Sequence, residues 1–418
     1  MPDSSFRKDR LMLAIYMNSR EWGGVDVLAA RFAEHLRERE LPFLFIDGED
    51  SRLRQEASWA PFLTPEQAAQ GQAQADAIFF PSIAKLRDPC IPWSIAKNNA
   101  RSFAWIVHPN DVVFHMMPLA RRLVGRFGPN AYKLARLARP QHFRLVRNTL
   151  AEMIDRGSVA VMDGATKRSL NHYYGLDAEP LQIPIPAPLG AASTVSRQPG
   201  GARLTFGYLG RLDAFKWSAL RPFVETGLAG LARHRDISLL AITDGPFAQD
   251  LRTLCKQHKI ELEITGFLPN NQARTCIRQR VDIGVAMGTA ALDIAAESLP
   301  CIVIDPAFDV RGEAQRLYRF IHETDDFTLG EYRDFAAYRE TGRPLEALVS
   351  DVLADPDASR RSREYVATRH DPETIFENLL DRIEKSELSA SSLSTMADRI
   401  NQSFQKSASL FGLRPRQP

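Results

Sequence analysis

The sequence predicts an α/β protein made of two parallel sheets in tandem. Short apolar runs alternate with longer amphipathic stretches along the 418 residues, and this alternation stops once, in a segment rich in proline and glycine. Alternation of this kind is typical of parallel sheets covered by helices. A chain of this length has room for two or three domains. We therefore expect two Rossmann-like domains in tandem.

The first series of elements opens the chain. A helical stretch over 24–39 places Val27, Leu28, Phe32 and Leu36 on one face, which is the spacing of an amphipathic helix. Apolar runs flank this helix, so the three elements form a strand, a helix and a parallel strand. Strands are expected over 11–17, 41–46, 77–80, 103–107 and 159–162. These elements assign the N-terminal domain to residues 1–185.

The second series follows the break in the pattern. Closely spaced prolines and small residues predict an interdomain linker over 186–202. After the linker, strands are expected over 204–209, 238–243, 261–265, 283–286 and 301–304, and helices over 217–232, 247–258, 271–280 and 290–298. The C-terminal domain is therefore assigned to residues 203–370.

The end of the chain is expected to leave the second domain. A C-terminal helix over 371–385 is expected to pack back toward the N-terminal domain. From Ser386 onward the sequence becomes rich in serine and has only a weak helical pattern. We therefore predict a mobile tail over 386–418.

The composition excludes several classes of protein. Lys and Arg number 53 and Asp and Glu number 51, so the net charge of +2 gives no global case for a nucleic-acid partner. The 4 cysteines are too far apart for a metal-binding pair and too few for a disulfide scaffold, which favours a reducing cytoplasm. The early apolar run over 11–17 is too short for a spanning helix or a signal peptide.

One candidate site is the loop over 207–216, which follows the first strand of the second domain. Arg211 and Lys216 stand five positions apart across the turn into a helix. Both cations can converge on an anion outside the strand ends, and a guanidinium with an ammonium suits a diphosphate. The alternative is an ordinary pair of surface charges.

A second candidate site lies over 287–293, between a buried strand and a helix. Gly288 permits close approach of the backbone, and the helix N-terminus offers unpaired N–H groups to a phosphate. The hydroxyl of Thr289 can donate as well, and Asp293, one turn further, can accept from hydroxyls. The alternative is a simple strand-to-helix turn with Thr289 as its N-cap.

With these motifs in place, the chain resembles the GT-B glycosyltransferases, and most closely the retaining glycosyltransferase family 4 (group 1). The resemblance covers residues 10–385 and implies an α/β GT-B fold, in which two Rossmann-like domains face each other across a cleft. It rests on Gly23 and Gly24 before the first helix, on His108 after a strand, and on the order and spacing of further motifs over 159–175, 207–216, 243–247, 265–269 and 292–304.

The resemblance implies roles for individual residues. Arg211 and Lys216 match the pair that neutralises the departing nucleotide diphosphate, and His108 matches a histidine near the donor sugar and the reaction centre. Gly23 and Gly24 match a loop that passes the diphosphate and the acceptor, and 265–268 matches the segment beside the nucleobase. The donor-binding set expected from the resemblance is Gly23, Gly24, Gly210, Asp244, Gly245, Gly266, Phe267, Leu268, Gly288, Thr289 and Asp293. The nucleotide-sugar is a substrate, and neither a metal nor another cofactor is expected.

The sequence departs from the family at one position. The family carries two glutamates, one toward the donor sugar and one toward the ribose. Here the second position is Asp293 and the first is Val285. The stretch 287–289 resembles family members in which backbone and hydroxyl groups replace the first carboxylate, and a catalytically weak member is the alternative.

A third feature is electrostatic. Residues 112–151 contain no acidic residue and 8 basic ones, interleaved with aromatic and aliphatic residues. This pattern suits an anionic bilayer or an anionic acceptor, while a solvated helix face is the alternative. The expected membrane or acceptor patch is Arg121, Arg122, Arg126, Lys133 and Arg136.

These observations together predict a retaining glycosyltransferase. It would move a sugar from a nucleotide-sugar to a saccharide or lipid-linked acceptor, in the synthesis of a cell-surface polysaccharide or glycolipid. The expected location is cytoplasmic, with peripheral attachment to the inner face of the membrane. The alternatives are a noncatalytic nucleotide-sugar-binding or scaffolding protein and a nucleotide-sugar epimerase on the same fold.

Overall fold

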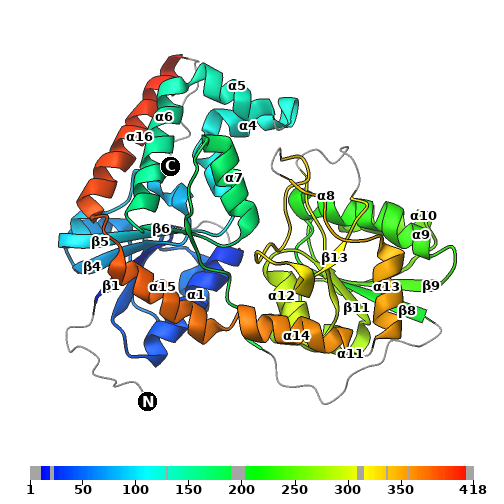
Figure 1. Cartoon of the computed structure of the whole chain (residues 1–418). Coiled ribbons are helices and arrows are strands. Elements are labelled where there is room, and N and C mark those ends of the chain that lie inside the picture. The colour runs from blue at the N-terminus through cyan, green and yellow to red at the C-terminus, as the bar shows by residue number, and fades with distance from the viewer. Residues whose placement is uncertain are drawn as a thin grey trace.

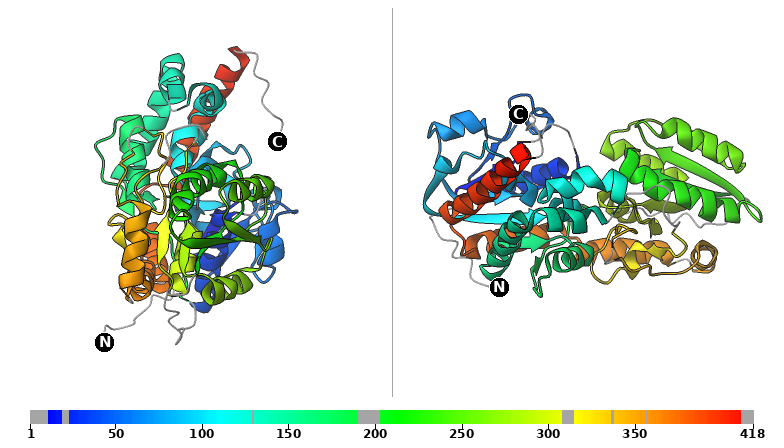
Figure 2. Two further views of the ribbon diagram at one scale, coloured as in Figure 1. Left: turned by 90° about the vertical axis from the view of Figure 1, so that its right-hand side faces the viewer. Right: turned by 90° about the horizontal axis from the view of Figure 1, so that it is seen from above.

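The structure is a computed structural model. It describes residues 11–18, 23–128, 130–189, 203–307, 315–335, 338–355 and 357–410, and for residues 125, 126 and 406–410 it describes the backbone alone. The described residues form two α/β domains (Figure 1). Figure 2 shows the domains side by side, with helices on both faces of each sheet. Most of the expected linker, residues 190–202, lies outside the described residues.

The N-terminal domain is built on a seven-stranded sheet with the order β3-β2-β1-β4-β5-β6-β7. All its pairings are parallel, and every residue of β1 and β2 is buried, as expected for strands covered on both faces. The strands are β1 (Leu13–Tyr16), β2 (Phe43–Ile46), β3 (Phe62–Leu63), β4 (Ala75–Phe80), β5 (Ala96–Ile106), β6 (Val159–Val161) and β7 (Leu181–Gln182).

The C-terminal domain has a six-stranded sheet with the order β10-β9-β8-β11-β12-β13. Its pairings are parallel except for the last strand, which is antiparallel to its neighbour. The strands are β8 (Arg203–Leu209), β9 (Asp236–Ile242), β10 (Glu261–Ile264), β11 (Ile283–Ala286), β12 (Cys301–Val303) and β13 (Arg319–Phe320).

The helices of the N-terminal domain connect its strands. They are α1 (Gly24–Glu38), α2 (Arg52–Glu56), α3 (Pro65–Ala69), η1 (Ile83–Arg87), η2 (Trp93–Ile95), η3 (Asp111–His115), α4 (Pro118–Phe127), α5 (Asn130–Ala138), α6 (Pro140–Asp155) and α7 (Gly164–Tyr174). Between β5 and β6 the chain forms four of these helices, so this crossover is far longer than the others.

The second domain has a similar set of connecting helices. They are α8 (Ala214–Pro222), η4 (Phe223–Leu228), α9 (Ala229–Leu231), α10 (Ala248–Gln257), α11 (Asn270–Arg280), α12 (Thr289–Ala296), η5 (Ile321–Glu323), α13 (Leu345–Ala354) and α14 (Ala358–Arg369). The chain then returns to the first domain through α15 (Pro372–Lys385), where the rings of Phe376 and Phe32 lie 5.2 Å apart.

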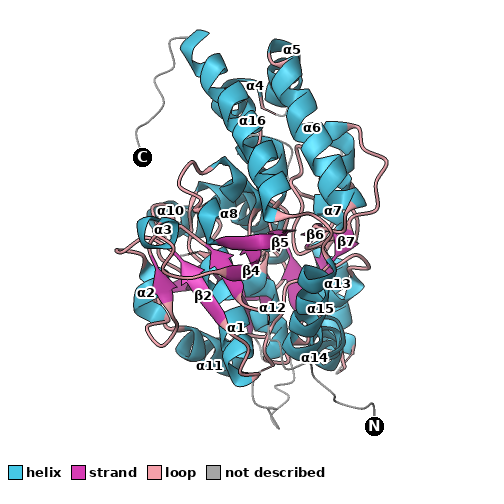
Figure 3. Ribbon diagram, turned by 90° about the vertical axis from the view of Figure 1, so that its left-hand side faces the viewer, coloured by secondary structure: helices cyan, strands magenta, loops and turns pink. Residues whose placement is uncertain are grey.

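The expectation of a mobile tail is wrong for the described residues beyond 386. They form α16 (Ala390–Leu410), which lies alongside α6 in Figure 3. Leu393, Ala397 and Ile400 are buried, and their spacing defines one helical face. Ser389 accepts from the N–H of Ser392 at 3.1 Å, so a serine here caps a helix rather than marking disorder. Residues 411–418 lie outside the described part of the chain.

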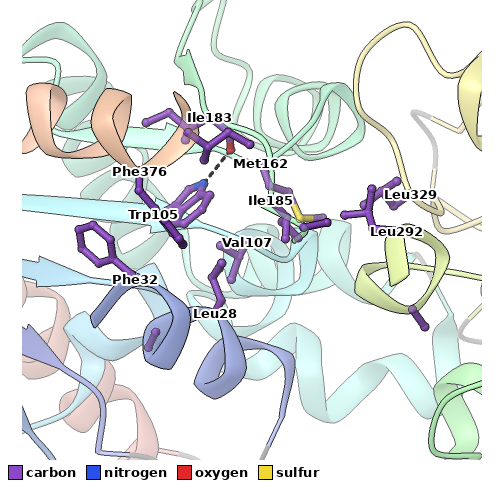
Figure 4. Packing of buried hydrophobic residues seen from close by; sticks show 14 of the residues in the cluster. Leu28, Phe32, Trp105, Val107, Met162, Ile183, Ile185, Leu292, Leu329 and Phe376 are labelled. Carbon is purple, nitrogen blue, oxygen red and sulfur yellow. Dashed lines mark hydrogen bonds between the residues drawn. The ribbon is translucent and has the colours of Figure 1, made fainter. Parts of the chain in front are cut away.

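One apolar cluster runs from the first domain into the second. Trp105 on β5 donates from Nε1 to the carbonyl of Ile183 at 2.9 Å and packs in the N-terminal part of this cluster (Figure 4). The cluster extends through Met162 to Leu292 on α12 and to Leu329 in the C-terminal domain. Because burial of apolar surface is the main stabilising term in folding, part of the shared core holds the two domains together.

Candidate functional site

The loop that carries Arg211 and Lys216 lies at the carboxyl edge of the second sheet. It follows β8, which pairs in parallel with β11, with Tyr208 opposite Val285. The connection from β11 to α12 therefore leaves the sheet beside this loop. The structure brings the two motifs that sequence reasoning singled out to one edge, which is where open α/β sheets bind ligands.

Lys216 lies in the first turn of α8 against Gly210. Asp213 caps this helix and accepts from the backbone N–H of Lys216 at 2.9 Å. Gly210 has a φ of +137°, and a Cβ there would lie 2.8 Å from Nζ of Lys216, so the loop needs glycine at this position. Burial lowers the pKa of Lys216, the carboxylates of Asp213 and Asp244 oppose this shift, and repulsion from the exposed Arg211 adds to it. An anion between the two cations would relieve this repulsion.

A second loop supports the shape of the first. The N–H of Leu212 donates to the carbonyl of Asp244 at 2.6 Å. A Cβ at Gly245, whose φ is +115°, would lie 2.7 Å from the carbonyl oxygen of Leu212. The rings of Phe247 and Trp217 stack at 5.8 Å. Gly245 therefore acts through backbone packing, while the side chain of Asp244 is exposed beside the cations.

Two helix N-termini approach each other at the junction of the domains. Gly288 precedes α12 with a φ of +60°, a conformation that favours glycine. A Cβ on Gly24, the first residue of α1, would lie 4.0 Å from the hydroxyl oxygen of Thr289. The N–H of Gly23 already donates to Asp26 at 2.8 Å. The positive ends of both helix dipoles therefore point into one region.

Asp293 lies further along α12 between two guanidinium groups. Its Oδ1 is 3.7 Å from a nitrogen of Arg31 on α1 and 3.8 Å from one of Arg274 on α11. Burial raises the pKa of Asp293, and the two arginines oppose this. Oδ1 is itself buried, and it lies slightly beyond hydrogen-bond distance of both guanidinium groups.

His108 follows β5 and lies at the junction. Its Nδ1 accepts from the N–H of Asn110 at 3.1 Å. Its ring lies 5.5 Å from the ring of Phe215, which precedes Lys216, and 6.1 Å from that of Tyr332. Burial lowers the pKa of His108, so the ring is neutral at physiological pH. The structure therefore places His108 beside the Lys216 loop.

Sequence reasoning missed one segment of the site, residues 326–335 of the C-terminal domain, which we name the docking segment. Its Asp326 and Glu331 form ion pairs with Arg168 on α7 of the N-terminal domain. The N–H of Gly164 donates to the carbonyl of Asp326 at 2.9 Å. The N–H of Gly288 donates to the carbonyl of Leu329 at 2.7 Å. The docking segment therefore joins the N-terminus of α12 to the opposite domain.

Asp163 caps α7 beneath the docking segment. Its Oδ1 accepts from the N–H of Thr166 at 2.7 Å. Burial raises the pKa of Asp163 from 3.8 to about 7, and the charges of Asp326 and Glu331 contribute to this rise. The junction thus holds a carboxyl group that keeps its proton through the mildly acidic range.

The segment expected beside the nucleobase presents an aromatic side chain. Phe267 is 66% exposed, which is unusual for a ring of this size. It follows Gly266, whose φ is +78°, and precedes Leu268, which packs against the shared apolar cluster. The loop is therefore anchored on one side of Phe267 and leaves the ring accessible.

The basic patch expected from the sequence lies on α4 and α5, which form a hairpin at the top of Figure 1. Arg121, Arg122, Lys133 and Arg136 are exposed there. The side chain of Arg126 lies outside the description. Among the residues whose side chains the structure describes, the large exposed hydrophobics are Phe127, Leu134, Leu137, Leu189 and Phe267, and three of them belong to this hairpin.

The described residues contain neither a cluster of metal ligands nor a helix that could span a membrane. No group of three or more His, Cys, Asp or Glu side chains among them is placed to hold a metal ion. No helix in the same part of the chain is both long and apolar enough to cross a membrane.

The fold is similar to solved glycosyltransferase structures. HepE of Anabaena, in complex with UDP and glucose, matches with a TM-score of 0.56 at 13% identity, over 90% of this chain and 100% of that one. The lipopolysaccharide outer core galactosyltransferase WaaB matches with a TM-score of 0.53 at 11% identity, over 89% and 99%. AviGT4, a glycosyltransferase of avilamycin A biosynthesis, matches with a TM-score of 0.50 at 12% identity, over 90% and 98%.

These likenesses confirm the expected fold, a GT-B arrangement of two α/β domains. No protein-family model and no curated protein matches the sequence. The structures therefore give the architecture, and the roles of individual residues rest on the geometry described above.

Asp163→Asn tests the protonated carboxyl at the junction. A carboxyl whose pKa rises to about 7 on folding binds more protons in the folded chain, so its contribution to stability falls as the pH rises from about 4 to about 7. Asparagine keeps the capping oxygen and cannot ionise. We expect the melting temperature of the variant minus that of the wild type to increase from pH 5 to pH 8. A difference that stays constant over this range contradicts the assignment.

Proposed function

We propose that the protein is a glycosyltransferase that moves a sugar from a nucleotide-sugar donor to a saccharide or lipid-linked acceptor at the junction of its domains. The observation that carries the proposal is the convergence of Arg211, Lys216 and the N-terminus of α12 at one sheet edge, with the N-terminus of α1 opposite. Helix N-termini and paired cations favour phosphate groups, and a nucleoside diphosphate fits both. The UDP and glucose bound to HepE support this ligand class.

In the proposed reaction, the bond between the anomeric carbon and the diphosphate oxygen breaks, and its electron pair stays on the phosphate. The acceptor oxygen forms the new bond and gives up its proton to the departing phosphate. Arg211 and Lys216 stabilise the charge that develops there, which is the largest contribution expected from the protein. The positive groups of the chain suffice for this role, so the proposal includes no metal and no other cofactor.

The other donor contacts follow from the same placement. Phe267 offers a ring on which a nucleobase can stack. The buried Oδ1 of Asp293, which accepts no hydrogen bond within the described residues, suits a ribose hydroxyl. His108 lies beside Phe215 and thus near the Lys216 loop, which suits a contact with the transferred sugar.

Val285 stands where the family carries its first glutamate, and other groups lie close to this position. Val285 is fully buried in β11. The docking segment covers the strand end there, where the carbonyl of Leu329 accepts from Gly288. We propose that the hydroxyl of Thr289 and the backbone N–H groups of Thr289 and Ala290 contact the sugar instead. Transfer with retention is part of the proposal through the family resemblance.

The two alternative functions are less well supported. An epimerase needs a set of carboxylates that acts on the nucleotide-sugar, and of those at the junction Asp326 and Glu331 are ion-paired with Arg168 and Asp293 lies between Arg31 and Arg274. A noncatalytic binding protein would hold a diphosphate with the same cations, and the likeness of the fold to two glycosyltransferases and to HepE with UDP and glucose bound supports transfer instead. We therefore favour the transferase.

Arg211→Ala and Lys216→Ala test the proposed cation pair. Each change should lower the rate of sugar transfer about 100-fold to 1000-fold, because loss of one donor to a developing negative charge has this effect. The rate is measured with the nucleotide-sugar that best stabilises the protein in a thermal screen of UDP, GDP and ADP sugars.

The controls are Arg252→Ala and Lys256→Ala, which remove the same charges from the exposed face of α10 in the same domain. They should transfer at the wild-type rate. The proposal for Arg211 and Lys216 fails if their variants melt normally and also transfer at that rate.

We also propose that the hairpin of α4 and α5 binds the anionic inner face of the membrane. Exposed Leu134 and Leu137 lie on α5 among exposed basic residues, and Phe127 ends α4. Apolar side chains inserted among lipid headgroups, with cations around them, are typical of interfacial helices. Each cation near an anionic surface contributes about 1 kcal/mol, screened over about 8 Å at physiological salt. A lipid-linked acceptor would be reached from this position.

Cosedimentation with vesicles tests the hairpin. The protein should pellet with phosphatidylglycerol vesicles at low salt, less at high salt, and not with neutral phosphatidylcholine. Arg121→Glu with Arg122→Glu should abolish pelleting, whereas the matched change of Arg252 and Lys256 to Glu on α10 should not. Indifference to lipid charge and to the hairpin substitutions would overturn the membrane proposal and favour a soluble acceptor.

A further inference from the structure

We infer that Tyr332 is a positioning residue that orients His108 from the opposite domain, so that contact between the domains sets the working geometry of the histidine. The inference rests on the proposed function for its catalytic consequence. It goes beyond that function by naming a residue of the docking segment that couples the contact between the domains to the orientation of His108.

The contacts form a chain of three residues. Nδ1 of His108 accepts from the backbone N–H of Asn110 at 3.1 Å, so in the neutral ring the hydrogen is on Nε2. The side-chain amide of the same Asn110 donates to the hydroxyl of Tyr332. The ring of Tyr332 also meets that of His108 edge to face, with centroids 6.1 Å apart. Tyr332 thus fixes both the residue that binds His108 and one side of its ring.

Tyr332 is itself held by groups from both domains. Its ring stacks on Phe335 with centroids 4.6 Å apart, and Phe335 in turn contacts Tyr173 on α7 at 5.3 Å and Phe114 at 6.0 Å. Phe215 of the C-terminal domain lies 5.2 Å from Tyr332. Aromatic contacts of this kind add specific geometry to burial. The position of Tyr332 is therefore coupled, through Phe335, to the contact of α7 with the docking segment.

A buried ion pair in the C-terminal domain anchors the backbone next to Tyr332. The carboxylate of Asp305 is paired with Arg319 through two hydrogen bonds of 2.9 Å and 3.0 Å, and both side chains are buried. Oδ1 of Asp305 also accepts from the N–H of Glu331 at 2.9 Å. Glu331 precedes Tyr332 and binds Arg168 of the other domain. The C-terminal domain thus presents Tyr332 from a rigid base, which is what positioning requires.

A direct role for Tyr332 in binding sugar does not fit its surroundings. Only 2% of the residue is exposed, and aromatic rings cover it from several sides. Neither face is open to a sugar or a nucleobase. Its hydroxyl already bonds Asn110, and its other neighbours are protein groups. The side chain therefore acts through Asn110 and His108.

Tyr332→Phe is the decisive variant, because it removes the hydroxyl and keeps the stacked ring. The turnover number should fall about tenfold, the effect expected for one buried hydrogen bond. The affinity for UDP, measured by calorimetry, should be unchanged. In histidine-labelled protein, the ¹⁵N shifts of His108 should move toward a mixture of the two neutral tautomers. His108→Ala assigns these signals.

The matched control is Tyr365→Phe. Its hydroxyl bonds Thr324 within the C-terminal domain and has no contact with His108. This variant loses a comparable hydrogen bond and should leave both the His108 signals and the turnover number unchanged. Asn110→Ala should reproduce the effects of Tyr332→Phe, and the double variant should be no worse than either single one, because all three break the same chain of contacts.

The proposed function and the positioning role of Tyr332 can be contradicted independently. If no nucleotide-sugar supports transfer, the proposed function fails, and the ¹⁵N shifts still test the link between Tyr332 and His108. If transfer is observed and Tyr332→Phe changes neither the turnover number nor the His108 shifts, the positioning role is wrong. Additive effects of Tyr332→Phe and Asn110→Ala would overturn it as well.

Discussion

The relative position of the two domains depends on the contact of Arg168 with Asp326 and Glu331. One guanidinium on α7 meets two carboxylates of the other domain, and the N–H groups at the start of the same helix donate to the docking segment. Breaking this contact would leave partly buried charges without partners, which costs far more than loss of a surface ion pair. The shared apolar cluster adds burial to this polar contact. The junction therefore favours one arrangement.

This arrangement is what assembles the candidate site. Neither domain alone holds all the proposed parts: Gly24, Arg31 and His108 come from the first domain, and the Lys216 loop and α12 come from the second. The ion pair between Arg31 and Asp293 and the approach of Gly24 to Thr289 exist only across the junction. Binding of a ligand there and closure of the domains must consequently favour each other.

The sequence was sufficient for the repeated α/β pattern and for the loops at strand ends, because both depend on local periodicity and on glycine. It was insufficient for contacts between distant segments. Arg168 and Glu331 are separated by 163 positions, and the docking segment has neither helical nor strand periodicity. The dense mixture of acidic and aromatic residues over 323–335 was the available signal. In the tail, the serine-rich composition masked the helical pattern. The buried face of α16 has few apolar residues, such as Leu393 and Ile400, but they recur at helical spacing.

Hydrogen exchange with and without a nucleotide-sugar tests the central claim most directly. In the proposed site the diphosphate lies beside segments 210–216 and 288–291, with segment 24–27 opposite. Exchange is followed with UDP-glucose, GDP-mannose and ADP-glucose in turn. When the nucleotide-sugar that binds is added, these three segments should exchange more slowly. Residues 326–335 should also exchange more slowly, because binding favours the closed arrangement of the domains. Protection confined to one domain, or lying away from these segments, would contradict the account.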